Sequence, residues 1–170
     1  MQQCHHHQQR GASLINSGPG ASQLLRELAE ATGFPVTSTL MGLGCYPASG
    51  DKWLGMLGMH GTYEANLAMH GCDLMINIGA RFDDRITGRI ADFSPGSVKA
   101  HIDIDPSSIN KVVRVDVPIV GDVGHVLEDM LKIWKSRGRK TNSAAVQQWW
   151  AQIEQWKATN CLAYTNSDTI

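Results

Sequence analysis

Short apolar runs alternate with segments of helical periodicity along most of this chain. Four apolar runs are short enough to be strands, and they cover residues 35–40, 73–79, 98–105 and 117–121. Apolar residues recur at helical spacing over residues 18–31, 62–70, 123–134 and 146–156. Strands that alternate with helices are typical of a parallel sheet whose connections run over its faces. The pattern therefore predicts an α/β fold, a doubly wound parallel sheet with helices on both faces.

The ends of the predicted helices carry recognisable signals. Pro19 lies at the start of the first helix and Gly33 just beyond its end, as helix capping favours. Asp122 precedes the third helix, where its carboxylate can accept from free backbone N–H groups. Before the first helix, the apolar piece at residues 14–16 is too short for a full strand. We therefore expect the first strand of the sheet to be missing.

Composition narrows the class of protein. A chain of 170 residues suits one domain with a substantial core. A formal net charge of −1 gives no bulk attraction to nucleic acid, so we expect no nucleic-acid partner. No apolar stretch approaches the roughly 18 residues that a membrane span needs, so we expect no membrane partner. Four scattered cysteines without a CxxC pair indicate neither a zinc site nor a disulfide framework, and fit a reducing, cytosol-like compartment.

The first ten residues are polar and include His5, His6 and His7. Three adjacent histidines bind metal loosely, but a polar tail without function is the better interpretation. We assign no metal ligand in this chain.

The richest candidate chemistry lies at residues 79–85, Gly-Ala-Arg-Phe-Asp-Asp-Arg, directly after the second predicted strand. A glycine there allows backbone to approach a ligand closely, and the arginines can hold a pyrophosphate through paired N–H donors. The aspartates can accept from hydroxyl groups or fix the arginines, although a solvated loop with local ion pairs is the alternative. The carboxyl ends of parallel strands share one rim, where such sheets bind ligands. A long cofactor in one crevice is therefore predicted from loops after four strands, at residues 39–42, 79–85, 103–105 and 121–123.

Three further residues have two interpretations each. Asp103, at the end of the third predicted strand, can accept ribose hydroxyl protons. The alternative is that this acidic strand end only starts a turn, with Asp105 before Pro106. Asp122 can contact the ligand or merely cap its helix. His60 lies in a glycine-rich loop and can donate to a ring carbonyl or a phosphate, although a lone histidine is commonly structural.

Motifs for catalysis are not visible in the sequence. We find no GxGxxG with a spaced acidic residue, no P-loop, no serine elbow and no cysteine nucleophile with an evident base. The residues alone indicate a cofactor-binding module, and we assign no catalytic residue.

Three motifs, at residues 38–44, 56–62 and 79–88, together make the chain resemble the large catalytic subunit of acetolactate synthase. The segments 101–105 and 121–123 continue the resemblance in the same order. It covers residue 11 to the carboxyl end and implies the central domain of that thiamine-diphosphate-dependent family, with a Rossmann-like fold that binds FAD. By resemblance, the FAD site is formed by Thr39, Leu40, Met41, Gly42, Leu57, Gly58, Met59, His60, Gly79, Ala80, Arg81, Phe82, Asp83, Asp84, Arg85, Asp103, Ile104, Asp122 and Val123.

The resemblance also implies the setting of this domain. The family condenses two 2-oxo acids on thiamine diphosphate and Mg²⁺, turning pyruvate into acetolactate for branched-chain amino acid synthesis, with FAD in a structural role. It implies flanking thiamine-diphosphate-binding domains, which hold the catalytic glutamate and the Mg²⁺-binding motif, together with a homo-oligomer and a regulatory small subunit. The implied home is the bacterial cytoplasm or an organellar stroma or matrix.

We accordingly divide the chain into a tail (1–10), an FAD-binding central domain (11–137), and a linker with an amphipathic helix (138–170) leading toward a further domain. The tryptophans of that helix can pack back on this domain or contact a missing one.

Two departures from the family pattern bear on cofactor affinity. Gly11-Ala12-Ser13 stands where the family usually has three glycines, and a polar tail replaces the strand before it. Added side chains crowd backbone approach and a lost strand bares its neighbour's edge, so we expect this chain alone to bind FAD weakly and to be inactive. The alternatives are a stand-alone nucleotide-binding module and the central domain of a related thiamine diphosphate enzyme that uses sulfoacetaldehyde or glyoxylate.

Overall fold

The computed structural model describes residues 19–138, 141 and 143–165. The polar tail, the segment Gly11-Ala12-Ser13, the short apolar piece at 14–16 and the first strand predicted to be missing all fall outside the described residues. The five described strands are β1 (Val36–Ser38), β2 (Trp53–Met56), β3 (Leu74–Ile78), β4 (Val98–Asp103) and β5 (Val117–Val120). The helices are α2 (Pro19–Thr32), α3 (Tyr63–Gly71), α4 (Asp84–Thr87), α5 (Val123–Ser136) and α6 (Ser143–Lys157), and the 3-10 turns are η2 (Leu40–Gly42), η3 (Ile90–Asp92) and η4 (Pro106–Ser108).

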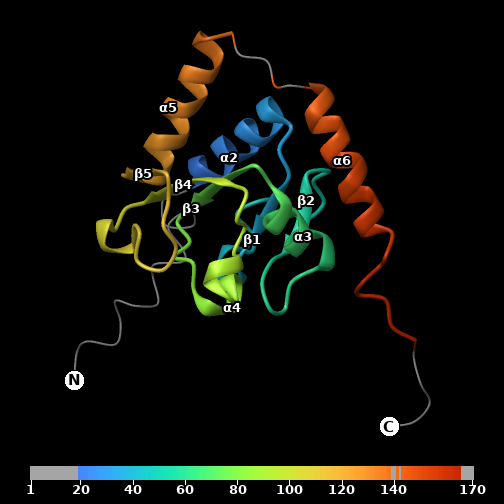
Figure 1. Ribbon diagram of the computed structural model, residues 1–170. Helices are drawn as coiled ribbons and strands as arrows, with labels where there is room; N and C mark the ends of the chain where they lie inside the picture. Colours follow the sequence, from blue (N-terminus) through green and yellow to red (C-terminus); the bar gives the residue numbers. More distant parts are fainter. Residues whose placement is uncertain (1–18, 139–140, 142, 166–170) are drawn as a thin grey trace.

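The described strands form two separate parallel sheets. One has the order β1-β2 and the other has the order β3-β4-β5 (Figure 1). Parallel pairing and crossover helices confirm the predicted α/β class, because parallel neighbours need connections that leave the sheet and return.

Two helices, α2 and α5, pack together over one face of the three-stranded sheet. Leu28 of α2 and Leu127 and Leu131 of α5 are buried in a cluster with Ile102 of β4. Ile76 and Ile78 of β3 join the cluster from its edge as partly buried side chains. The amphipathic spacing of α5 produces this contact, because its apolar residues recur every three or four positions.

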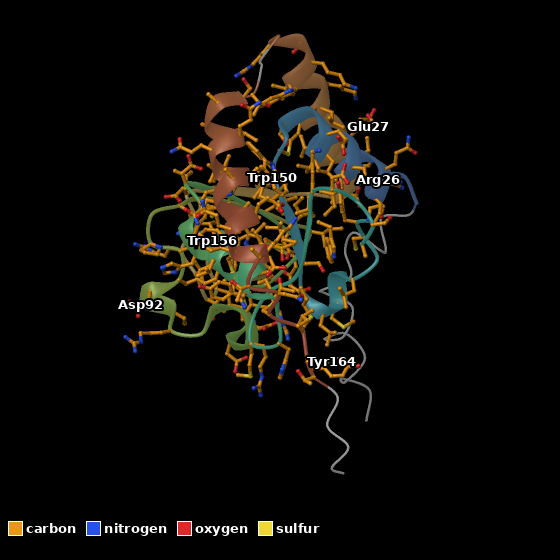
Figure 2. All side chains as sticks on the ribbon, turned by 90° about the vertical axis from the view of Figure 1, so that its right-hand side faces the viewer. Arg26, Glu27, Asp92, Trp150, Trp156 and Tyr164 are labelled. Atoms are coloured by element: carbon orange, nitrogen blue, oxygen red, sulfur yellow. The ribbon has the colours of Figure 1, made fainter. Side chains whose placement is uncertain are left out.

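The helices α3 and α6 form a second cluster against the two-stranded sheet. Leu54, Ala65 and Ile153 are buried there, and Trp149 and Trp156 pack against them. Trp150 of α6 also donates its indole N–H to the Gly33 carbonyl at 2.8 Å, which ties α6 to the end of α2. Figure 2 shows Trp150 and Trp156 along α6 on the side turned to the viewer. The tryptophan-rich helix therefore packs back on this domain.

The structure changes some predicted element bounds. The first predicted strand is shorter, because the chain turns into η2 at Leu40. Strand β2 was not predicted, since its four residues include Gly55, which breaks the apolar pattern and has φ 97°. Glycine adopts such a φ without strain.

Candidate functional site

A large cleft opens where the two sheets face each other. Its volume is about 1710 Å³ and its walls include β1, β3 and the loops that follow β1, β2 and β3. Of the predicted site residues, it is lined by Thr39, Leu40, Met41, Gly42, Leu57, Met59, His60, Ala80, Arg81, Phe82, Asp83 and Arg85. The structure thus brings together three of the predicted segments at one rim.

The loop after β2 packs directly on the loop after β3. The Met59 N–H donates to the Arg85 carbonyl at 2.8 Å. Gly58 is buried at φ 95°, and a Cβ there would lie 2.5 Å from the Arg85 carbonyl oxygen. The glycine is therefore required by this loop contact, both for its backbone conformation and for the space.

A side chain that sequence reasoning missed holds the same loop. Asn66 of α3 accepts from the Gly58 N–H at 2.7 Å and donates to the Gly58 carbonyl at 3.0 Å. Thr62, the N-cap of α3, accepts from the Ala65 N–H at 3.2 Å and donates to the Leu54 carbonyl at 2.7 Å. The detectable signal for Asn66 was a polar residue one helical turn after the N-cap, which alone does not reveal its partner.

The loop after β1 presents apolar side chains to solvent. Thr39 accepts from the Gly42 N–H at 3.2 Å and so starts the 3-10 turn. Leu40 is 67% exposed and Met41 51% exposed, while Met59 across the rim is 64% exposed. Large apolar side chains gathered at one exposed rim are typical of a ligand or partner site.

The charged residues of the third segment are accessible. Arg81 lies 3.8 Å from Asp83, between the guanidinium Nε and a carboxylate oxygen, and both side chains are more than a third exposed. Arg85 is exposed and its guanidinium reaches the Met59 sulfur at 3.7 Å. Asp84 is exposed at the first position of α4. Two accessible guanidinium groups can bind a diphosphate.

Phe82 anchors this segment to the sheet. It is 5% exposed, has φ 56°, and packs edge-on against Phe93 and against His101 of β4, with ring centroids 5.6 and 5.1 Å away. Asn77 of β3 also donates its amide to the Ala80 carbonyl. The backbone of the segment is therefore held in place while its charged side chains stay accessible.

The predicted residues at the carboxyl ends of β3, β4 and β5 that remain, Gly79, Asp103, Ile104, Asp122 and Val123, lie outside the cleft lining. Gly79 donates its N–H to the Ile102 carbonyl, and Gly121 donates to the Asp103 carbonyl, so the loops after β3, β4 and β5 follow one another. Asp122 caps α5 by accepting from Gly124 and His125 N–H groups at 2.9 and 3.2 Å. Val123 is buried in the core and Ile104 is 60% exposed.

Asp103 is the one buried carboxylate of this group. It is 2% exposed, and one of its oxygens accepts from the Asp105 N–H at 2.9 Å. The other oxygen has no hydrogen-bond partner among the described residues and lies 3.7 Å from Nε2 of buried His101. A buried carboxylate oxygen without a donor is unusual and marks a polar position.

Two cysteines that line the cleft are poor nucleophiles. Burial raises the pKa of the Cys45 thiol and the pKa of the Cys72 thiol. A raised pKa lowers the fraction of reactive thiolate. Among the described residues, no group of three or more His, Cys, Asp and Glu side chains is arranged to hold a metal ion. In the same part of the chain, every helix falls short of the length and apolar character of a membrane span.

Comparison with known proteins identifies relatives. The family model "Thiamine pyrophosphate enzyme, central domain" matches residues 11–130. The chain is 49% identical over 152 residues to the acetolactate synthase isozyme 3 large subunit of Escherichia coli, covering 89% of this chain and 26% of that protein. It is 47% identical over 149 residues to the acetolactate synthase large subunit of Haemophilus influenzae, covering 88% of this chain and 26% of that protein.

An archaeal relative agrees with these two. The chain is 54% identical over 121 residues to the probable acetolactate synthase large subunit of Methanocaldococcus jannaschii, covering 71% of this chain and 20% of that protein. The chain thus spans about a quarter of the length of the curated relatives it matches. The parallel sheets, the flanking helices and these matches together show that the chain belongs to the thiamine pyrophosphate enzyme family and corresponds to its central domain.

Proposed function

We propose that this chain is the FAD-binding central domain of an acetolactate synthase. The observation that carries the proposal is the meeting of the loops at 57–60 and 79–85 at the mouth of the cleft, joined by the bond from Met59 to Arg85. Relatives named as acetolactate synthases support the same assignment.

The residues at the rim fit a long, doubly charged cofactor. Arg81 and Arg85 are accessible and can bind a diphosphate through paired N–H donors. Exposed Leu40, Met41 and Met59 can cover the apolar faces of a ring system. Asp103 is buried and lies outside the cleft lining, so we assign it a supporting position beside the rim, where it accepts from the Asp105 N–H.

The chain's own role in this proposal is binding and orientation. Ring contacts of Phe82 hold the loop at 79–85, and the two hydrogen bonds between Asn66 and Gly58 hold the loop at 57–60. Arg81 and Arg85 therefore extend from a fixed backbone. When bound in the whole enzyme, thiamine diphosphate with Mg²⁺ supplies the chemistry that decarboxylates pyruvate and joins it to a second 2-oxo acid. We assign FAD a structural role and none of the described residues a catalytic one.

The proposed partners follow from the short coverage of the relatives. We place this domain between two thiamine-diphosphate-binding domains in a homo-oligomer with a regulatory small subunit, in the cytoplasm or an organellar stroma or matrix. Our divisions at residues 10 and 137 belong to the same proposal.

Titration of the purified chain with FAD, followed by flavin fluorescence, tests the proposal. We expect weak, saturable binding that drops about tenfold or more when both charge-assisted contacts are removed in the R81A/R85A double variant. Arg89→Ala is the matched control, because Arg89 pairs with Asp92 at 3.0 Å and is not part of the cleft lining. Equal affinity in the double variant, or no binding by a chain with a folded circular dichroism spectrum, would overturn the proposal for this chain. Submicromolar binding would contradict the expected weakness.

A further inference from the structure

Met59 and Arg85 are joined twice at the rim of the cleft. Along the backbone, the Met59 N–H donates to the Arg85 carbonyl at 2.8 Å. Between the side chains, Nη1 of the Arg85 guanidinium lies 3.7 Å from the Met59 sulfur and donates a hydrogen bond to it. The Met59 thioether is therefore held beside one of the two guanidinium groups that can bind a diphosphate.

The backbone on both sides of this pair is fixed. Asn66 exchanges two hydrogen bonds with Gly58, the residue directly before Met59. A Cβ at Gly58 would lie 2.5 Å from the Arg85 carbonyl oxygen, so the two loops are in close contact. Arg85 itself is the second residue of the short helix α4. The two side chains thus start from neighbouring backbone positions, and a chemical change at the sulfur acts directly on the arginine.

The sulfur of Met59 is accessible to solvent. Among the described methionines, Met59 and Met41 are exposed. The other described methionines, Met56, Met69, Met75 and Met130, are half-buried. In the described part of the chain, Met59 is also the one methionine whose sulfur accepts a hydrogen bond. Peroxides in solution can therefore reach Met59, and Met41 is an exposed methionine on the same rim for comparison.

Oxidation turns this sulfur from a weak hydrogen-bond acceptor into a strong one. A thioether sulfur accepts hydrogen bonds only weakly. Hydrogen peroxide transfers one oxygen to it: the S–O bond forms while the peroxide O–O bond breaks, and the sulfur gives up two electrons. The second peroxide oxygen leaves as water with both protons. The product is a polar sulfoxide, whose oxygen can accept a charge-assisted hydrogen bond from a guanidinium.

The Arg85 guanidinium is available to such an acceptor. Arg81 lies 3.8 Å from the Asp83 carboxylate, whereas Arg85 has no carboxylate partner among the described residues. A hydrogen bond from a cation to a strong acceptor is roughly twice as strong as one between neutral groups. A sulfoxide on Met59 and a diphosphate in the cleft would thus compete for the same donors.

We propose that Met59 is a methionine oxidation site, and that its sulfoxide oxygen accepts from the Arg85 guanidinium and holds it away from a ligand in the cleft. The oxidation and the new hydrogen bond do not depend on the identity of the ligand. The loss of ligand binding rests on the proposed function, in which Arg85 binds the diphosphate of FAD. A methionine sulfoxide reductase reverses the change, because two thiols become a disulfide while the sulfoxide oxygen leaves as water.

Peroxide treatment of the full chain, followed by peptide mass spectrometry, tests the site of oxidation. Dithiothreitol is added afterwards, since it reverses sulfenic acids and disulfides at cysteine and leaves methionine sulfoxide in place. We expect Met59 and Met41 to gain one oxygen at least about fivefold faster than half-buried Met56, because exposure controls access to the sulfur. Oxidation of Met59 no faster than that of Met56 would overturn the inference.

NMR of the arginine side chains tests the new hydrogen bond without any ligand. On oxidation, we expect the Arg85 side-chain N–H signals to shift and their exchange with water to slow about fivefold, because the guanidinium gains a stronger acceptor. Met59→Leu keeps a similar apolar volume and cannot be oxidised, so peroxide should leave its Arg85 signals unchanged. In Met41→Leu the Arg85 response should persist. Unchanged Arg85 signals in the oxidised chain, or an equal response in Met59→Leu, would contradict the proposal.

Titration with FAD measures the consequence for the cleft. It is done in Met41→Leu, where Met59 is the exposed methionine that remains among the described residues. We expect oxidation to weaken binding about tenfold and methionine sulfoxide reductase to restore it, since one charge-assisted contact is lost and regained. If the untreated chain binds no FAD, the proposed function fails, while mass spectrometry and NMR still decide the inference. Equal affinity before and after oxidation, in a chain that binds FAD, would overturn the competition for Arg85.

Discussion

Strand β4 and strand β3 lie side by side in the same sheet, yet they differ in burial. His101, Ile102 and Asp103 of β4 are at most 2% exposed. In β3, Met75 to Ile78 are all half-buried and Leu74 is 41% exposed. Among the strands that the structure describes, β4 has a neighbour on each side and β3 has one. Burial of a parallel strand therefore depends on both of its neighbours as well as on its own apolar sequence.

The two-stranded sheet repeats this lesson. All three residues of β1 are half-buried, although α2 and α3 both lie beside the cleft that β1 lines. Helices on both faces do not fully bury β1, which pairs along one edge only in the described part of the chain. The contrast between a closed and an open edge can be tested at the backbone, in the core and at the helix ends.

The largest expected effect is an alternating pattern of amide exchange along β3. The N–H groups of Met75 and Asn77 face β4, while those of Ile76 and Ile78 face the cleft. We predict that the cleft-facing amides exchange about a thousandfold faster, a difference of about 4 kcal/mol in opening free energy, because paired strands open only with the core. Residue-resolved hydrogen exchange measures it. In β4, neighbouring Ala100 and His101 should be equally protected, and uniform protection along β3 would contradict the comparison.

A matched pair of core substitutions should show a smaller effect. Ile102 of β4 and Ile78 of β3 are register partners in one apolar cluster, but Ile102 is fully buried and Ile78 is only partly buried. We predict that Ile102→Ala lowers the free energy of unfolding by about 3 kcal/mol and Ile78→Ala by about half as much. Denaturant unfolding followed by circular dichroism measures both. Equal losses would indicate that the open edge does not weaken packing beside it.

Helix caps should show the smallest effect, of similar size in both halves. Thr62 caps α3 beside the two-stranded sheet, and Asp122 caps α5 beside the three-stranded sheet. We predict that Thr62→Ala and Asp122→Ala each cost about 1 kcal/mol, since each leaves helix N–H groups without an acceptor. Asp122→Asn is the control that keeps an acceptor oxygen. A loss several times larger for Thr62→Ala would show that its bond to the Leu54 carbonyl stabilises the smaller sheet as a whole.

Several elements could be predicted because their signals are local. The apolar runs of β3, β4 and β5 end in glycine or aspartate, and the apolar spacing of α5 fixes the face it buries. The capping role of Asp122 also follows from residue type and position, as predicted. Strand β2 escaped prediction because four residues with an internal glycine carry too little periodicity.

The candidate site was predictable in its segments and less so in its arrangement. The positions of loops after predicted strands pointed to residues 39–42, 79–85, 103–105 and 121–123, and the family resemblance added 57–60. The structure gathers 39–42, 57–60 and 79–85 around one cleft and leaves the other two segments outside its lining. Asn66 was missed, because its partner Gly58 comes close only when α3 folds back on the loop. The role of the gathered residues in FAD binding stays a prediction.

By itself, the sequence determined the α/β class, the family and the segments that form the rim, because each rests on short-range order of apolar, glycine and charged residues. Only the tertiary structure decided that the described strands divide into two sheets, that Phe82 packs on His101, and that β1 and β3 line one cleft. The physical reason is that edge pairing and burial are contacts between distant residues, which local patterns do not encode.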